Sequence, residues 1–416
     1  MKAMLNVDLA FQKLVGLVRP IGETERLVIA DAVGRIAADP VTAPIDLPPF
    51  DSSAMDGYAV DATNLDSVAH FEVVDESLAG RPATHALSTP GKAIRVFTGA
   101  VMPKGANAVV LQEDVAKHGN TITTTEPIHR NQHVRQRGHD VHRGAVLCRP
   151  GTRLSHFHLT WFAACGIEEV TVSRRIRVGV FSTGDELAER GTPLKPGQIY
   201  DSNRFAIISL LREKAAETFD LGCLPDDPDV IANALRDASL DMDLLLTSGG
   251  VSVGDADFVK EAVERVGSME FWNIALKPGK PLAIGTVGKS LFFGLPGNPV
   301  STLVTYLLFV APTIDRLGGQ QPMAPLTLTA VLEGGVKHTA GRREYLRGTL
   351  RSTDDRPTVA PTGDQGSNRL ATLAGANCLI VVNEARHNIE DGELVEVMVL
   401  PDEGAHLVVD QERALP

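Results

Sequence analysis

Three short apolar runs in the middle of the chain each end at a glycine-containing turn. The runs are IRVGVF (176–181), LDMDLLLTS (240–248) and SLFFGL (290–295), and segments of helical spacing follow at 203–216, 257–266 and 300–317. Apolar strands that alternate with helices predict a parallel sheet with helices packed on it. Ligands bind at the carboxyl ends of such strands. The three turns are therefore candidate binding loops.

The pattern changes on both sides of this α/β region. Short runs rich in Val, Thr, Gly and Pro predict strands within 43–139, and again within 321–416, where we expect a small β-barrel or sandwich. Helices are expected over residues 1–42 and over 153–166, the latter ending at Gly166. Leu5, Leu9, Leu14 and Leu17 are expected on or near one face of the first helix. Asn203 is a candidate N-cap, and QQPMAP (320–325) is the expected linker to the last region.

Charge and composition exclude several classes of protein. The 416 residues carry 40 Lys and Arg against 52 Asp and Glu, a net charge of −12, which disfavours broad binding to nucleic acid. An acidic protein can still bind an anion through a local basic pocket. The apolar stretch 303–311 is shorter than the ~20 residues of a membrane span, so none is expected. Asp8, Gln12 and Lys13 interrupt what would be a signal peptide, and the cytoplasm is the simplest location.

Two residue types offer weak metal signals. None of the four cysteines forms a C-x-x-C pair, which argues against a zinc knuckle or a disulfide framework. Six of the twelve histidines lie between residues 129 and 158, and pairs such as His139 with His142 could in principle bind a metal. No cysteine or carboxylate completes a tetrahedral set, so hydrogen bonding is the default interpretation for these histidines.

The turns after the apolar runs carry glycines and acids. TSGGVSVGD (247–255) stands between a strand and a helix, where free N–H groups suit a phosphate, although a tight turn is the simpler alternative. Acid pairs occur at 185–186, 226–227 and in 255–257. Such carboxylates suggest Mg²⁺ bound together with substrate phosphates, whereas the alternative is helix N-capping. We expect Asp185 and Asp227 to be largely structural and Glu186, Asp226 and Asp257 to be functional.

Two proline-fixed loops add rigidity and charge. KPGKP (277–281) presents Lys277 and Lys280, and LPGNP (295–299) directly precedes a helix. Proline presets the backbone angle φ, so both loops are stiff. Stiffness suits a site that must hold several ligand groups in register.

In combination, these motifs resemble one family, the molybdopterin molybdenumtransferases, which also includes the E domain of gephyrin-type proteins. PPFDSSAMDGYA, VFTGA-VMP, RGHD, VFSTGDEL, SGGVSVGDAD, KPGKP and LPGNPVS match the family in order and spacing. GRREYLRG and GDQGSNRL extend the match into the last region. The resemblance covers essentially the whole chain.

The resemblance implies an α/β plus β architecture in several domains. Residues 1–42 and 140–174 would form an elongated, partly helical domain, and 43–139 an inserted β domain. Residues 175–320 would form a molybdopterin-binding α/β domain with a parallel sheet, and 321–416 a C-terminal β-barrel. The resemblance further implies a homodimer, with a molybdopterin adenylyltransferase and molybdoenzyme acceptors as partners.

The implied reaction is the insertion of molybdenum, from molybdate, into adenylylated molybdopterin, which releases AMP and depends on Mg²⁺. By resemblance, the catalytic acids are Glu186, Asp226, Asp257, Asp140 and Asp56, of which the first three would hold the Mg²⁺ ion. The residues expected to bind substrate are Thr98, Ser248, Gly249, Gly250, Ser252, Lys277, Lys280, Pro296, Pro299, Arg347 and Ser367, with Arg369 as a further candidate cation.

Two positions depart from the family pattern. His139 stands where the family usually has Glu, and Asn273 where many members have Lys, which would remove one cation from the substrate pocket. Two alternatives also stay open. One is a homologue that inserts tungsten from tungstate, and the other is a non-enzymatic dimeric scaffold of the gephyrin type. The retained acids favour the enzyme.

Overall fold

A computed structural model describes residues 4–63, 69–249, 258–321, 325–353 and 355–400, together with the backbone of 408–409. The chain divides into two compact units. The first contains Met1–Glu25, Gly34–Ile36 and Ser173–Pro416, and the second contains Arg26–Val33 and Ala37–Val172.

A six-stranded sheet forms the centre of the first unit. Its order is β16-β13-β17-β21-β20-β18, and the first four strands run parallel to one another. The apolar runs became strands β13 (Ile176–Thr183), β17 (Leu244–Ser248) and β21 (Ser290–Leu295), which confirms the predicted parallel sheet. The other strands are β16 (Ala216–Leu224), β18 (Gly267–Asn273) and β20 (Pro281–Val287). β20 and β18 add an antiparallel edge.

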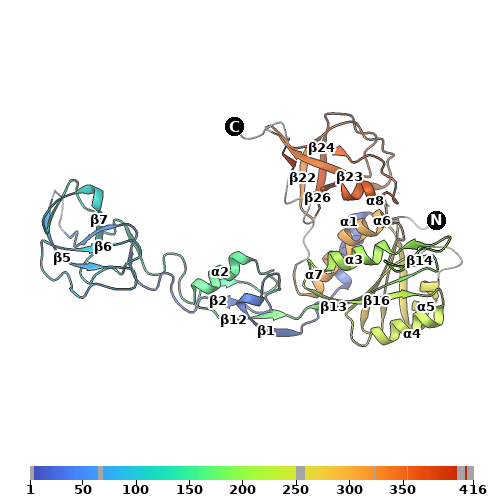
Figure 1. Ribbon diagram of the computed structural model, residues 1–416, viewed down its shortest axis with the longest axis horizontal. Coiled ribbons are helices and arrows are strands. Elements are labelled where there is room, and N and C mark those ends of the chain that lie inside the picture. The colour runs from blue at the N-terminus through green and yellow to red at the C-terminus, as the bar shows by residue number, and fades with distance from the viewer. Residues whose placement is uncertain are drawn as a thin grey trace. The chain divides into compact units, whose positions relative to one another are not determined.

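Helices cover both faces of this sheet (Figure 1). Leu244 and Leu246 face the cluster that includes α3 (Ser202–Leu211), whereas Leu245 faces α4 (Pro228–Ala238) and α5 (Phe258–Val266). Alternate residues of each central strand are thus buried on opposite faces. A strand buried on both faces reads as a continuous apolar run, which is the pattern seen in the sequence.

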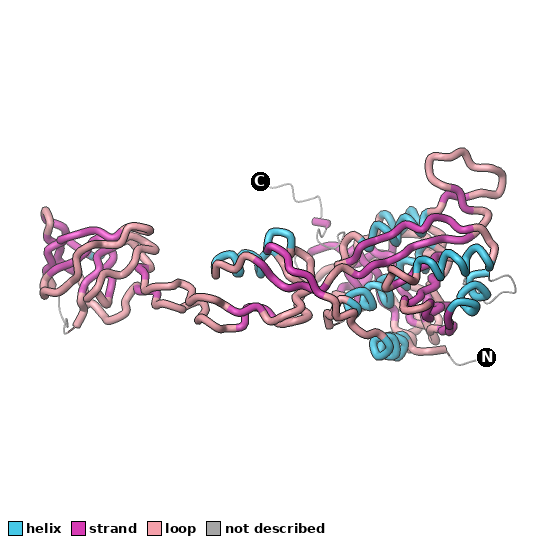
Figure 2. Tube along the Cα trace, turned by 90° about the horizontal axis from the view of Figure 1, so that it is seen from below, coloured by secondary structure: helices cyan, strands magenta, loops and turns pink. Residues whose placement is uncertain are grey.

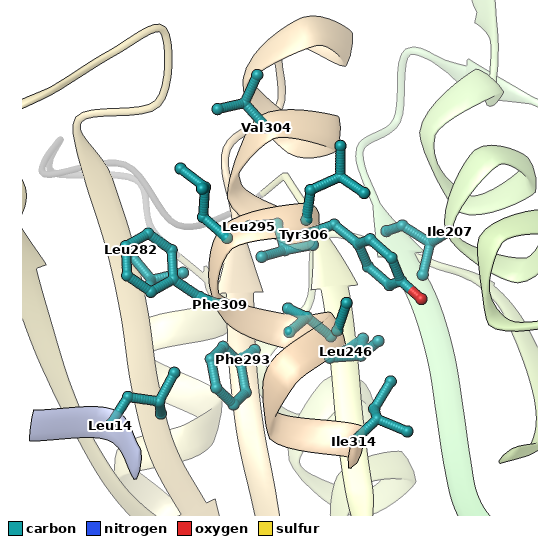
Figure 3. Packing of buried hydrophobic residues seen from close by; sticks show 14 of the residues in the cluster. Leu14, Ile207, Leu246, Leu282, Phe293, Leu295, Val304, Tyr306, Phe309 and Ile314 are labelled. Carbon is teal, nitrogen blue, oxygen red and sulfur yellow. The ribbon is translucent and has the colours of Figure 1, made fainter. Parts of the chain in front are cut away.

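One long helix fills the core beside α3 (Figure 3). It consists of α6 (Pro299–Thr305), a π-helical segment η3 (Tyr306–Val310) and α7 (Ala311–Leu317). Tyr306 and Phe309 pack in the same cluster as Phe293 of β21. By length and composition this helix could cross a membrane, but 83% of it is buried inside the protein. Such burial is what a core helix shows.

A closed β-barrel follows this helix. Strand β23 pairs with both β24 and β25, so the path β23-β24-β22-β26-β25 returns to β23. The bounds are β22 (Thr327–Leu332), β23 (Arg343–Ser352), β24 (Thr358–Pro361), β25 (Cys378–Val382) and β26 (Leu394–Val399), with α8 (Leu370–Ala374) and β27 (Val408–Val409). The short strand β19 (Leu276–Lys277), from the KPGKP turn, pairs in parallel with β23.

The second unit consists of short strands joined by long loops, with one α-helix among its described residues (Figure 2). Its six-stranded sheet has the order β7-β4-β6-β5-β9-β8. The bounds are β4 (Gly57–Val60), β5 (His70–Ser77), β6 (Lys92–Val96), β7 (Ala108–Leu111), β8 (Val115–His118) and β9 (Thr121–Thr124). The expected strand region within 43–139 is therefore confirmed. Helix α2 (His156–Ala164) is capped by Ser155, and Gly166 follows it with φ of 75°.

The remaining strands form two-stranded sheets. They pair β1 (Thr24–Val28) with β12 (Glu169–Ser173), β2 (Val41–Thr42) with β11 (Val146–Cys148), β3 (Ser52–Ser53) with β10 (Val134–Arg135), and β14 (Leu187–Ala188) with β15 (Ile199–Tyr200). Short 3-10 turns, η1 (Ile29–Asp31) and η2 (Gln112–Asp114), complete the elements.

Three helix expectations were wrong. Helix α1 covers only Val7–Leu17 of the expected 1–42, and a strand and a 3-10 turn follow it. Its buried residues are Val7, Ala10 and Leu14, whereas Leu9 and Leu17 are exposed, because the face that packs on α7 and η3 is set by those helices. Asp201, not Asn203, caps α3 by accepting from the backbone N–H of Arg204.

Candidate functional site

A pocket of about 670 Å³ lies in the first unit, between the carboxyl ends of the parallel strands and the barrel. The turns after β13, β17 and β21 contribute to it, together with the KPGKP turn. Its lining consists of Glu186, Gly249, Lys277, Pro278, Gly279, Lys280, Pro281, Pro296, Gly297, Asn298, Ser301, Arg342, Glu344, Tyr345, Leu346, Gln365, Gly366 and Ser367. The turns that the sequence predicted as binding loops are far apart along the chain, and they meet at this one cavity.

Glu186 supplies a carboxylate to the pocket wall. Gly184, two residues earlier, has φ of 142°, a backbone conformation that L side chains rarely adopt. A Cβ atom at Gly184 would lie 2.6 Å from Oε2 of Glu186. The glycine thus leaves room for the carboxylate directly above the turn.

Asp226 lies beside this turn, at the end of β16. The backbone N–H of Asp185 donates to its Oδ2 at 3.4 Å. Burial raises the pKa of Asp226, and the carboxylates of Asp185 and Glu186 raise it further. The neighbouring Asp227 caps α4 by accepting from the N–H groups of Asp229 and Val230. The structural expectation for Asp227 is therefore confirmed.

Three cations line the same pocket as Glu186: Lys277, Lys280 and Arg342. Lys277 Nζ lies 2.6 Å from Oε1 of Glu344, and its side chain is 48% exposed. Lys280 and Arg342 are exposed, and within the described part of the chain neither has an ion-pair partner. These side chains form the local basic pocket that an acidic protein needs to bind an anion.

Arg347 does not have the expected position. Its side chain is completely buried, and it donates to the backbone carbonyls of Asp364, Gln365 and Gly366. It supports the loop that lines the pocket and is absent from the lining itself, whereas the sequence predicted a direct contact with substrate. Arg369 pairs with Asp364 at 2.9 Å and is absent from the pocket lining.

Arg342 was missed by the sequence analysis. GRREYLRG contains three arginines, and the pattern alone does not say which one faces a ligand. The choice depends on the pairing of β19 with β23, which brings the start of β23 to the pocket. Sequence spacing carries no signal for that contact.

The remaining expected residues of the first unit fall into three groups. Gly249, Pro296 and Ser367 line the pocket, whereas Ser248, Pro299 and Asn273 do not. Ser248 is 3% exposed at the end of β17, and Pro299 is the first residue of α6. Asn273 is half-buried at the end of β18, opposite Pro281. Gly250, Ser252 and Asp257 belong to 250–257, outside the described residues.

The second unit holds the other expected acids. Asp56 Oδ1 accepts from the backbone N–H of Thr98 at 2.7 Å and from its hydroxyl at 2.8 Å. These hydrogen bonds lower the pKa of Asp56. Asp140 accepts from Trp161 Nε1 at 3.1 Å, and His139 beside it is exposed. Both acids are thus held by neighbours within their own unit.

The donor set near the pocket suits a hard cation. Among the described residues, no group of three His, Cys, Asp or Glu side chains could hold a metal ion. Glu186 and Asp226 interact electrostatically, so a cation beside them would relieve their repulsion. Mg²⁺ is commonly bound by one or two carboxylates plus substrate phosphates and water. The two acids fit that pattern.

Three family models together span most of the chain. They are described as the MoeA N-terminal region (domain I and II), matching residues 5–166, a probable molybdopterin binding domain, matching 179–316, and the MoeA C-terminal region (domain IV), matching 329–400. The gap between the last two models, 317–328, contains the expected linker 320–325, of which 322–324 lie outside the described residues.

Two relatives of similar length have the same name, and a longer relative has another. A molybdopterin molybdenumtransferase of Haemophilus influenzae is 42% identical over 95% of this chain and 98% of its own length. One from Nostoc sp. is 36% identical over 91% of this chain and 89% of its own. A gephyrin of Dictyostelium discoideum is 28% identical over 91% of this chain but only 60% of its own length.

Solved structures agree with these relatives. A molybdopterin biosynthesis moeA protein from Pyrococcus horikoshii superposes with a TM-score of 0.82 at 29% identity, covering 95% of this chain and all of that one. The fold, the family models and the relatives coincide over nearly every residue. The chain belongs to the molybdopterin molybdenumtransferase family.

Proposed function

We propose that this protein inserts molybdenum from molybdate into adenylylated molybdopterin and releases AMP. Family membership makes it a transferase of molybdenum cofactor biosynthesis. The specific substrates and the release of AMP are supported by one observation. Lys277, Lys280, Arg342 and Glu186 line the same pocket of about 670 Å³. Both proposed substrates are anions, and this pocket gathers cations in a protein of net charge −12.

The cations would act on the pyrophosphate that joins AMP to the pterin. Breaking that bond leaves negative charge on the departing phosphate, and fixed cations stabilise charge as it develops. The stiff KPGKP turn and its pairing with β23 hold Lys277 in place before substrate arrives. Preorganised groups of this kind pay no reorganisation cost at the moment of reaction.

The acids would orient the phosphates and the oxygen of water or molybdate that forms a new bond to phosphorus as the bridging P–O bond breaks and AMP leaves. Glu186 lies in the pocket wall and can accept a proton or a hydrogen bond from a reacting oxygen. Asp226, beside it, would share with Glu186 the binding of Mg²⁺. When bound, that ion would offset phosphate charge as an additional Lewis acid.

The direct test is AMP release from adenylylated molybdopterin, with molybdate and Mg²⁺ present. Wild type should release AMP, and Glu186→Gln should lose at least about 100-fold in rate, the scale typical of a lost acid–base group. Asp237→Asn, which removes an exposed acid from α4, is the matched control and should keep full activity. A wild type that releases no AMP would contradict the proposal.

A parallel reaction with tungstate distinguishes the alternative metal. Molybdate and tungstate have the same charge and nearly the same size. The rates of AMP release with each oxyanion therefore show which metal the protein prefers. Homodimer formation and the expected protein partners stay predictions from the family resemblance, and the cytoplasmic location stays a prediction from the N-terminal sequence.

A further inference from the structure

Lys277 is held by a buried acid that is itself held by a histidine. Glu344, on β23, is 4% exposed, and its Oε1 contacts Lys277 Nζ at 2.6 Å. Its other oxygen, Oε2, lies 2.8 Å from Nδ1 of His338, whose side chain is 1% exposed. Both oxygens of one carboxylate are thus engaged, one by a pocket lysine and one by a fully buried imidazole.

The backbone fixes the same arrangement. In the parallel pairing of β19 with β23, Lys277 stands opposite Glu344. Asn388 accepts a hydrogen bond from the backbone N–H of His338 at 3.0 Å, which anchors the histidine to the barrel. The lysine therefore lies on a short strand that joins the barrel sheet from the KPGKP turn, whereas Glu344 lies on β23 and His338 on the segment that precedes β23.

These residues also stand between two cavities. Lys277, Arg342 and Glu344 line both the large pocket and a neighbouring one of about 350 Å³, which His338 and Lys337 line as well. A lysine side chain has four rotatable bonds and would otherwise sample both spaces. An ammonium carries three donors, so Lys277 can keep Glu344 and still donate to a ligand.

One feature of His338 points to a role other than stability. Its Nε2 atom is buried and has no hydrogen-bond partner among the described residues. An unpaired buried polar atom costs free energy, and an apolar side chain would avoid that cost. What the imidazole supplies in return is a directed contact from Nδ1 to Oε2 of Glu344.

We infer that Glu344 and His338 are positioning residues that hold the Lys277 ammonium at the wall of the large pocket, ready for a phosphate or pyrophosphate group. The inference rests on the proposed function for the identity of the ligand. It differs from a simple charge effect, because a carboxylate that acted only through its charge would weaken the binding of anions.

The test is the affinity of the full-length protein for inorganic pyrophosphate, measured by calorimetry. Glu344→Gln removes the charge, whereas Glu344→Asp keeps the charge but is too short to reach both partners. Positioning predicts that each weakens binding by about three- to tenfold, the scale of one charge-assisted hydrogen bond. A charge effect alone predicts tighter binding for Glu344→Gln and no change for Glu344→Asp, and that result would overturn the inference.

A double-mutant cycle separates positioning from a general structural role. In the Lys277→Ala background, the Glu344 and His338→Gln substitutions should change affinity by less than about twofold, because they act through a lysine that is gone. Equal losses in both backgrounds would overturn the inference. Glu333→Gln, which removes the same charge from an exposed pair with Arg351 on the barrel, is the control and should bind as wild type.

Pyrophosphate binding needs no turnover, which keeps the two proposals apart. Coupling between Glu344 and Lys277 without AMP release would count against the proposed reaction and would support the positioning pair. AMP release without coupling between Glu344 and Lys277 would support the proposed reaction and would overturn the positioning inference. A wild type that does not bind pyrophosphate would also overturn the inference. Thermal melting of each variant verifies that it is folded.

Discussion

At the scale of single residues, the turn after β13 shows how a glycine leaves room for a functional side chain, the carboxylate of Glu186. Gly184 combines a positive φ with the close approach of the Glu186 carboxylate. The positive φ disfavours any residue with a side chain at that position, and the close approach means that an added Cβ would displace the flexible end of Glu186. Together they tie the conformation of the turn to the position of the acid.

Gly184→Ala should therefore impair the reaction more than the fold. The added Cβ would lie 2.6 Å from Oε2 of Glu186, so the carboxylate must move. We expect AMP release to fall by about 10- to 100-fold, since small misplacements of reacting groups are costly, with a loss of stability of about 1–2 kcal/mol from the strained φ. Gly191→Ala tests a positive-φ glycine with open space around it, and should lose stability alone. Equal activities would contradict the steric argument.

Asp226 makes a prediction about pH. Its pKa is raised in the folded protein, so between its ordinary value of 3.8 and the raised value the folded state binds more protons than the unfolded state. The free energy of unfolding should then fall as the pH rises through that window, and stay lower above it.

Asp226→Asn removes the titrating carboxyl, and with it this pH-dependent loss in the free energy of unfolding. The variant should melt about 1–2 °C higher than wild type at pH 7, and the difference should shrink as the pH is lowered toward 4. Melting curves over that range provide the measurement, with Asp237→Asn as the control for loss of one acid. A difference that grows at low pH would mean that the raised pKa of Asp226 is not its cause.

At the scale of elements, the loop 364–367 depends on a buried arginine. Arg347 of β23 donates to three successive carbonyls of that loop, and burial lowers the pKa of its guanidinium. The loop contributes Gln365, Gly366 and Ser367 to the pocket. Arg347 therefore supports the pocket wall from behind.

Arg347→Met should destabilise the protein by about 3 kcal/mol, because it removes the three hydrogen bonds that the buried guanidinium donates to the loop carbonyls. Pyrophosphate binding should weaken as the loop loses support. The salt dependence of that binding should keep the wild-type slope, since no ligand-facing cation is removed. A shallower slope would restore Arg347 to the ligand contacts. Arg342→Met, which removes an exposed cation that lines the pocket, should show that shallower slope.

The same elements show what the sequence could predict and what it could not. Continuous apolar runs identified β13, β17 and β21, because strands buried on both faces have no polar alternation. Since parallel strands end at one edge, Glu186, Gly249 and Pro296 could be expected to meet there. The choice between Arg342 and Arg347 depends on the β19–β23 pairing, and the buried face of α1 depends on α7 and η3. Such contacts join residues far apart in the chain, and no local pattern encodes them.

At the scale of the whole molecule, the two compact units should respond differently to a ligand. Every residue that lines the large pocket belongs to the first unit, whereas Asp56, Thr98 and Asp140 belong to the second. Large multidomain chains often unfold in more than one step. We expect two thermal transitions, one for each unit.

The two tryptophans of the chain can assign these transitions, because Trp272 lies in the first unit and Trp161 in the second. Trp161→Phe and Trp272→Phe variants each leave one fluorescent reporter. Pyrophosphate at 100 times its dissociation constant stabilises a binding unit by about 2.7 kcal/mol, which corresponds to a rise of about 5 °C or more in the melting temperature of a unit of this size. The Trp272 transition should show that rise, and the Trp161 transition should stay within about 1 °C. An equal rise in both melting temperatures would mean that pyrophosphate also stabilises the second unit. The pocket residues of the first unit would then not account for the whole effect.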